Sequence, residues 1–176
     1  SLHIAVNNGS KEIFDFLLND ERITIGDSCF KGCVLLKQIN IPNFIHEIGN
    51  NAFFGCASLN EITIPSSVVS IGSFSFYGCK LLTEIQIPSS VKSIGNGSFN
   101  GCSSLKSISI PSSISSIEAD CFDGCSSLIE INMPSTIASI GMFSFNECTL
   151  LKQIEIPSTV SSIKEGMFTK CTSLKE

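Results

Sequence analysis

"SSVKSIGNGSFNGCSSLKSISIP", residues Ser89–Pro111, decides the fold, because the residues that follow begin the same 23-residue phrase again. One phenylalanine and one cysteine keep their places in every copy of the phrase. Self-similarity at a constant period is typical of proteins in which each structural unit packs only on its neighbours. The sequence therefore predicts a solenoid of stacked coils, in which no coil is stable by itself.

Aligned copies give fixed columns of side chains. The phenylalanine column is Phe30, Phe53, Phe76, Phe99, Phe122, Phe145 and Phe168. The cysteine column is Cys33, Cys56, Cys79, Cys102, Cys125, Cys148 and Cys171. One copy cannot bury its apolar side alone, so we expect both columns to form ladders inside the rod. Burial stabilises a phenylalanine by about 1.5–3 kcal/mol, so the aromatic column should supply much of the driving force for folding.

Each copy also carries the pattern L-x-x-I-x-I-P, as in Leu105–Pro111. Alternate residues of a strand point to opposite faces, so both isoleucines face inward, and the proline ends the strand because it lacks an N–H. A second, shorter extended piece follows, and S-F-N-G-C then forms a tight turn or a single helical turn. Most copies place glycine before the cysteine and after the last isoleucine, which predicts turns that prefer a left-handed residue.

The composition excludes several classes of partner. The net charge is −5, and no basic block points to nucleic acid or to an anionic membrane surface. No apolar run approaches the ~18 residues of a membrane helix, so we expect no membrane span in this segment. No signal peptide is visible. The sequence begins with Ser1 and stops at the start of a strand, so we expect a segment whose solenoid continues or is closed beyond Glu176.

The combined pattern L-x-x-I-x-I-P-x-x-V-x-x-I-G-x-x-x-F-x-x-C resembles the BspA-like leucine-rich repeat, a class found in surface proteins of mucosal bacteria and parasitic protists. The resemblance covers about Thr24–Glu176, with the first and last copies incomplete. It implies a mainly β, right-handed, curved solenoid over residues 22–176. It also implies adhesion, since bacterial members are linked to extracellular matrix proteins and to other cells.

The first residues do not fit the repeat. Residues 1–21 are similar to part of an ankyrin repeat. The matching residues are Leu2, His3, Ala5, Gly9, Ile13, Leu17 and Leu18. Apolar residues from 11 to 18 recur at helical spacing after the Asn8-Gly9 break. We expect a helical segment that covers the apolar end of the first coil, either derived from an ankyrin repeat or a cap of no particular ancestry.

The cysteine column invites a metal or redox interpretation. A metal site needs about four converging ligands, whereas stacked thiols point in parallel, and the two histidines, His3 and His46, lie outside the column. We expect free, buried thiols that pack as small hydrophobic groups and donate S–H to a turn carbonyl. The many serines have no plausible general base. The sequence thus predicts no catalytic residue, no metal and no cofactor, and a protein that is not an enzyme; a redox-active thiol protein is the alternative.

The candidate binding site is the strand face, whose residues flank the inward isoleucines and point to solvent. One row is Gln38, Glu61, Glu84, Ser107, Glu130 and Gln153. The next row is Asn40, Thr63, Gln86, Ser109, Asn132 and Glu155. Neither row contains Lys or Arg, while the position just before them carries Lys37, Lys106 and Lys152. These rows predict an acidic and amide strip with a basic margin; the alternative is a solvated sheet face with no partner.

Two functions stay open. The first is a non-catalytic surface adhesin or antigen that binds host or matrix proteins through the strand face. The second is an intracellular scaffold for protein–protein interaction, which the ankyrin-like start and free thiols favour, since free thiols suit a reducing compartment. The sequons at Asn8 and Asn96 favour secretion weakly. The location is therefore the cell surface or the cytoplasm, and the partner is a protein in both cases.

Overall fold

The computed structural model describes residues 24–175 of the chain. This part contains nine short strands and no helix. The four three-residue strands are β1 (Gln38–Asn40), β3 (Glu61–Thr63), β6 (Ser107–Ser109) and β8 (Glu130–Asn132). The five two-residue strands are β2 (Glu47–Ile48), β4 (Ser70–Ile71), β5 (Ser93–Ile94), β7 (Ser116–Ile117) and β9 (Ser139–Ile140).

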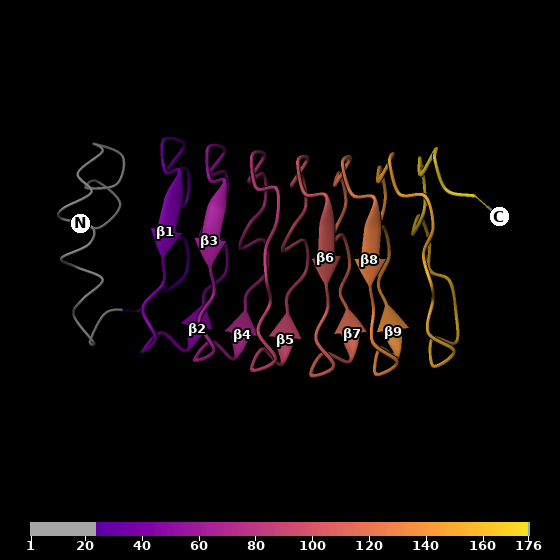
Figure 1. Ribbon diagram of the computed structural model, residues 1–176, viewed down its shortest axis with the longest axis horizontal. Coiled ribbons are helices and arrows are strands. Elements are labelled where there is room, and N and C mark those ends of the chain that lie inside the picture. Colours follow the sequence, from indigo (N-terminus) through magenta and orange to yellow (C-terminus); the bar gives the residue numbers. More distant parts are fainter. Residues whose placement is uncertain (1–23, 176) are drawn as a thin grey trace.

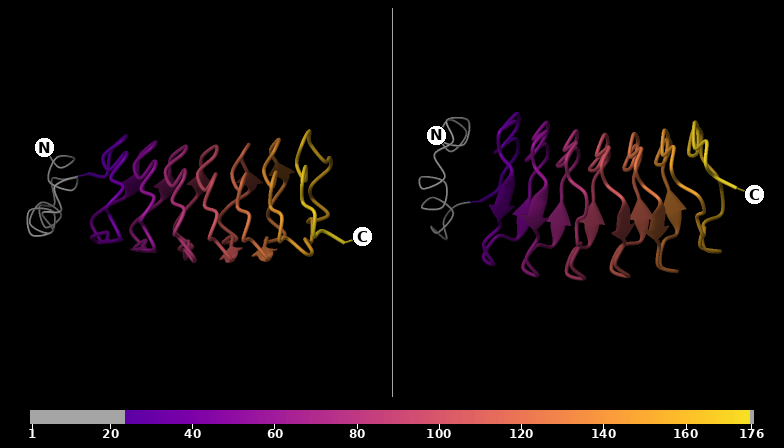
Figure 2. Two further views of the ribbon diagram at one scale, coloured as in Figure 1. Left: turned by 90° about the horizontal axis from the view of Figure 1, so that it is seen from above. Right: turned by 45° about the horizontal axis from the view of Figure 1, so that its top comes forward.

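All strand pairs are parallel, and their register confirms the solenoid. β1 pairs with β3, β6 with β8, and β7 with β9, while β2, β4 and β5 form a three-stranded sheet. The partner of each residue lies 23 positions further on, as in Ile39↔Ile62 and Ile48↔Ile71. Figures 1 and 2 show the coils in one nearly straight row, with the three-residue strands above the two-residue strands in Figure 1.

The interior consists of ladders of identical side chains. Successive rings of the phenylalanine column are stacked, with centroids 5.0–5.8 Å apart and interplanar angles of at most 10°. The rings from Phe30 to Phe145 are fully buried, whereas Phe168 in the last described coil is half-buried. Each ring therefore depends on the coils on both sides of it, as expected for a one-dimensional stack.

The S-F-N-G-C segments are turns, not helical turns. Alternate N–H groups of each turn donate to carbonyl oxygens of the next coil, as in Phe30 N to Ala52 O (2.7 Å) and Phe99 N to Cys121 O (3.0 Å). The residues two places before and two places after each phenylalanine have positive φ, for example Gly97 at 58° and Gly101 at 71°. This ladder of turns joins all described coils, so the copies at 84–86 and 153–155 stack without forming strands.

Glycine is favoured at two positions of the repeat for different physical reasons. Glycine before the cysteine is left-handed, as the sequence predicts. Glycine after the last isoleucine is not left-handed, which corrects that part of the prediction. A Cβ on Gly72 would lie 2.6 Å from the Asn50 nitrogen and 2.7 Å from the Gly49 carbonyl carbon. Close approach of successive coils, rather than φ, therefore selects glycine at this position.

Two matched substitutions separate these reasons. Gly72→Ala should lower the free energy of unfolding by about 2 kcal/mol, because the added carbon meets the backbone of the preceding coil. Gly32→Ala should cost about 1 kcal/mol, because a Cβ there meets nothing within 4 Å and only the left-handed conformation is unfavourable. Urea unfolding measures both. An equal or larger loss for Gly32→Ala would contradict the assignment.

The predicted helical segment, residues 1–21, lies outside the described residues. Within residues 24–175 we find no helix long and apolar enough to cross a membrane.

Candidate functional site

The strand face presents all twelve predicted side chains to solvent. In β3, Glu61 and Thr63 are exposed on either side of the buried Ile62, and the same alternation holds in the other copies, with the central Ile154 of the last one half-buried. The alternation follows from the period of a strand, in which successive side chains point to opposite faces. The structure therefore brings the two predicted rows together on one side of the rod.

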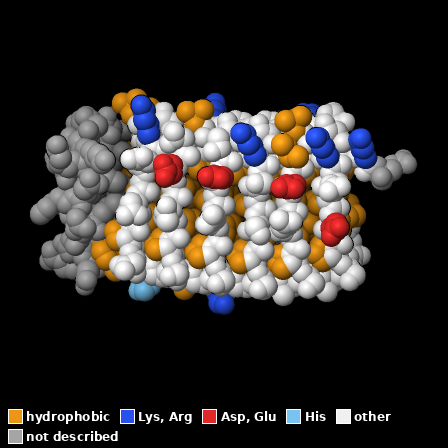
Figure 3. Space-filling model, in the orientation of Figure 1, with side chains coloured by type: hydrophobic (Ala, Val, Ile, Leu, Met, Phe, Trp, Pro, Cys, Tyr) orange, Lys and Arg blue, Asp and Glu red, His pale blue; other side chains and the backbone are white. Residues whose placement is uncertain are grey.

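The charges of this face are sorted into lines. Figure 3 shows Lys side chains along its upper edge and a line of acidic side chains just below them. The only ion pair found in residues 24–175 joins Lys170 to Glu147, which lie in the turns that carry the phenylalanine column. The acidic row and the basic margin therefore face solvent without neutralising each other.

The basic margin is flanked by an apolar column that the sequence analysis missed. Leu35, Leu81 and Leu150 are 66%, 52% and 47% exposed, and they lie two residues before the margin lysine or its equivalent. Ile129 occupies a lysine position of the margin and is 40% exposed. The three leucines share one position of the 23-residue repeat, which was the available signal, but serine occupies that position in the other copies.

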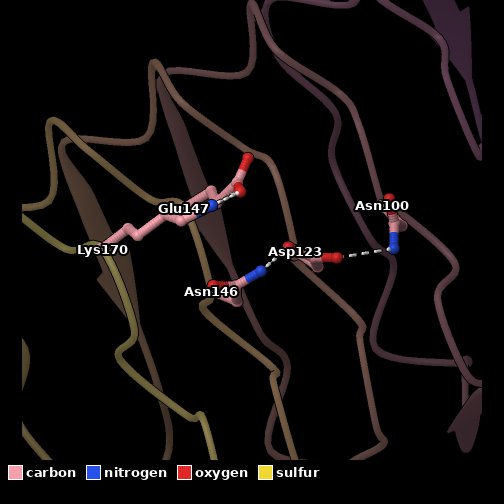
Figure 4. Close-up of polar contacts among 5 residues, drawn as sticks. All are labelled: Asn100, Asp123, Asn146, Glu147 and Lys170. Atoms are coloured by element: carbon pink, nitrogen blue, oxygen red, sulfur yellow. Dashed lines mark hydrogen bonds and ion pairs between the residues drawn. The ribbon is translucent and has the colours of Figure 1, made fainter.

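A second group of polar contacts follows the turns (Figure 4). Asp123 accepts hydrogen bonds from Asn100 Nδ2 (3.2 Å) and Asn146 Nδ2 (2.7 Å), which belong to the coils on either side. Burial raises the pKa of the Asp123 carboxyl, and the two amide donors oppose that rise. Both carboxylate oxygens thus have partners within the protein, so these residues act as clamps between coils.

The same turn position carries aromatic residues nearer the N-terminus. Lys31 Nζ lies 5.0 Å from the centroid of the Phe54 ring, and that ring stacks on Tyr77 with centroids 4.5 Å apart. Cation–π and stacking contacts of this kind stabilise by about 0.5–1.5 kcal/mol each. The sequence analysis missed this column too, because its residues share a position but not a chemical type.

A shallow groove of about 390 Å³ lies beside the two-residue strands. It is lined mainly by serine, asparagine and glycine, together with Glu47 and Glu118. Several lining groups bond to the protein itself: Ser116 Oγ donates to Glu118 (2.7 Å), and Ser73 N donates to Asn50 Oδ1 (2.8 Å). Since these polar groups are already paired, the groove is a weaker candidate than the strand face.

The nine cysteines are free and all but two are buried. Each thiol from Cys56 to Cys171 in the column donates to the carbonyl oxygen of a phenylalanine in the preceding coil, as in Cys102 Sγ to Phe76 O (3.2 Å). Burial raises the pKa of the Cys102 thiol to about 12. The column thus consists of neutral thiols that act as small hydrogen-bonded core groups.

Potential metal ligands do not converge in the described part of the chain. No group of three or more His, Cys, Asp or Glu side chains there could hold a metal ion. His46 is exposed, and its Nδ1 lies 3.2 Å from the Ser67 carbonyl oxygen, where the ring N–H donates. His3 lies outside the described residues.

Similar solved structures share this architecture. A leucine rich cell surface protein from Faecalibacterium prausnitzii is 34% identical, covers 86% of this chain and 41% of its own length, and gives a TM-score of 0.77. The T. pallidum leucine rich repeat protein is 29% identical over 73% of this chain and 71% of its own, with a TM-score of 0.58. The pneumococcal vaccine antigen PcpA is 25% identical over 81% and 35%, with a TM-score of 0.50.

A comparison with curated proteins gave no significant match. The family profile described as "BspA type Leucine rich repeat region (6 copies)" matches residues 23–119 and 70–176. That match begins after the ankyrin-like segment, so it gives the ankyrin interpretation no support. Together with the 23-residue register and the stacked phenylalanines, it shows that this chain belongs to the BspA-type leucine-rich repeat family.

Proposed function

We propose that this chain is a non-catalytic scaffold of the surface adhesin or antigen type, which binds a host or matrix protein through its strand face. The observation that carries the proposal is the pair of exposed rows on one face. These rows are rich in amides and in carboxylates, and none of these carboxylates has an ion-pair partner among residues 24–175. The similar F. prausnitzii protein is described as a cell surface protein, and PcpA as a vaccine antigen, which supports the surface location.

The mechanism is contact at many points on a rigid surface. The buried ladders hold each coil in place, so the exposed side chains between them keep a fixed spacing. A preorganised surface loses little conformational entropy when a partner binds. Rows of one charge also steer an oppositely charged partner and fix its orientation. Affinity would therefore be spread over several coils instead of residing in one pocket.

Reversing two charges tests the face. Glu84→Lys combined with Glu130→Lys should weaken binding at least tenfold while leaving thermal stability unchanged, because both side chains are exposed. Binding is measured by surface plasmon resonance against a panel of extracellular matrix proteins and a panel of cytosolic proteins. The matched control, Glu47→Lys with Glu165→Lys, makes the same change in net charge outside the strand face. Equal effects of both double variants would move the binding site elsewhere.

The second candidate is an intracellular scaffold, which the free cysteines favour because reduced thiols persist in a reducing compartment. The two candidates differ in accessibility on living cells. A surface protein is labelled by a membrane-impermeant reagent on intact cells, whereas a cytosolic scaffold is labelled only after lysis. Exposed Asn96 offers a further readout, because a glycan there requires passage through the secretory pathway.

A further inference from the structure

The upper margin of the strand face combines exposed lysines with exposed leucines. We define it by Lys37, Lys106 and Lys152 in one column and Leu35, Leu81 and Leu150 in the column two residues earlier. All six side chains are exposed, and no ion pair neutralises the lysines among the described residues. The leucines are two and three coils apart, with serine at the same position of the coils between them. The upper margin therefore alternates separate apolar contacts with unpaired positive charges along one edge, a combination that a partner with both apolar and acidic side chains would complement.

The dimensions of the upper margin match a short extended peptide. Successive phenylalanine rings are 5.0–5.8 Å apart, and Lys37 and Lys152 are five coils apart. The line from Lys37 to Lys152 is therefore roughly 27 Å long, which about eight extended residues span at ~3.3 Å each. Side chains of an extended peptide alternate in direction, so one set can meet the leucines while the other meets the lysines.

We propose that the upper margin binds an extended polypeptide segment in which acidic and apolar residues alternate. The inference deepens the proposed function and rests on it, since it names the chemistry of the segment that the protein partner presents. Carboxylates of the segment pair with Lys37, Lys106 and Lys152, and its apolar side chains cover Leu35, Leu81 and Leu150.

The neighbouring acidic row favours a peptide over an extended polyanion. Glu61, Glu84 and Glu130 come immediately after the position of the lysine column in their copies of the repeat. Figure 3 shows a line of acidic side chains just below the line of lysines on this face. A flat anionic membrane is wider than the lysine column, so it would contact the acidic row as well and be repelled by the carboxylates. A peptide is narrow enough to contact the lysine column alone. The net charge of −5 adds to that repulsion.

The test uses a fluorescein-labelled 12-residue peptide with alternating Leu and Asp, added to the complete 176-residue chain. Fluorescence anisotropy should show saturable binding that weakens at least tenfold in Lys106→Glu with Lys152→Glu. Leu81→Ser with Leu150→Ser should weaken binding several-fold without changing its salt dependence. The matched control, Lys92→Glu with Lys164→Glu, changes the charge equally away from the upper margin and should bind like the parent chain.

Other probes define the results that would overturn the proposal. A peptide with Lys in place of Asp should not compete for the upper margin. Vesicles containing phosphatidylserine, or heparin, should bind more weakly than the Leu-Asp peptide. If either bound more strongly, and if that binding were lost in the Lys106/Lys152 variant, the ligand of the upper margin would be a lipid or polysaccharide polyanion instead of a peptide. Unchanged binding of the Leu-Asp peptide to the Lys106/Lys152 variant would also contradict the proposal.

The same assay separates this inference from the proposed function. Glu84→Lys with Glu130→Lys should strengthen binding of the acidic peptide, because it removes repelling carboxylates, although it weakens binding of the matrix or host protein. If the Glu84/Glu130 variant binds the matrix protein as the parent chain does, while the Lys106/Lys152 variant loses peptide binding, the proposed function is wrong and the inference about the upper margin is supported. If the Glu84/Glu130 variant loses matrix binding while the Lys106/Lys152 variant still binds the peptide, only the inference about the upper margin is wrong.

Discussion

Phe99→Ala should lower the free energy of unfolding by about 3–5 kcal/mol, the range for removing a large aromatic side chain from a packed core. The Phe99 ring is fully buried and stacks between Phe76 and Phe122, at centroid distances of 5.5 and 5.6 Å. Coils of a solenoid are stabilised mainly through their nearest neighbours, so the cavity weakens two junctions at once. The loss should also divide the rod into two regions that unfold separately.

Urea unfolding followed by two signals measures both effects. Circular dichroism reports on the whole rod, while the fluorescence of Tyr77, the single tyrosine, reports on the N-terminal side of the cavity. Transitions that no longer coincide reveal two cooperative units. Phe168→Ala is the matched control, because Phe168 is half-buried and has one stacking neighbour among the described rings. An equal loss in both variants, or an unchanged transition for Phe99→Ala, would contradict the stacked column.

The second large effect is expected at alkaline pH, where the protein should unfold. Burial raises the pKa of the Cys56 and Cys102 thiols from 9.0 to about 12, and those of Cys79, Cys125 and Cys148 also rise. An unfolded chain therefore loses its thiol protons at a lower pH than the folded chain. The stabilisation by neutral thiols is complete below about pH 9 and decreases as the pH rises toward the folded values.

The size of this effect follows from linkage. Between the unfolded and folded pKa values, each buried thiol removes about 1.4 kcal/mol of stability per pH unit. Several such thiols together can overcome the ~5–15 kcal/mol of a typical domain within about two pH units. We therefore expect the urea midpoint to change little from pH 7 to 8 and to fall steeply between pH 9 and about 11.

The measurement needs a reductant and one cysteine variant. Cys102→Ala loses some stability at pH 7, but its stability should fall less steeply with pH, because one buried thiol is absent. Iodoacetamide should label the native thiols of the column slowly at pH 8 and rapidly in urea. A urea midpoint that stays constant from pH 7 to 11, or fast labelling of Cys102 in the folded chain, would refute the buried neutral column.

The sequence alone determined which residues are neighbours. A 23-residue period assigns every residue a partner one coil away, and the alternation of the I-x-I segment predicts which side chains are buried. The Phe and Cys columns, the exposed strand-face rows and the S–H donation to a turn carbonyl could all be predicted because stacking reduces the fold to one dimension. The lysines of the margin were visible for the same reason, whereas the structure showed that they have no ion-pair partner among residues 24–175.

Only the tertiary structure decided how closely the coils approach and how the chain turns between them. Gly72 was interpreted as a left-handed turn residue, but the backbone of the preceding coil lies where its Cβ would be. Phe74 has φ 55°, although phenylalanine disfavours that region, and its ring covers Gly97 in the next coil. The hydrogen bonds of Asp123 with Asn100 and Asn146 join different residue types at one repeat position. Because that position has no repeated residue type, the sequence pattern could not predict these contacts. A period specifies which side chains meet, whereas the backbone path through each turn sets the distance and direction at which they meet.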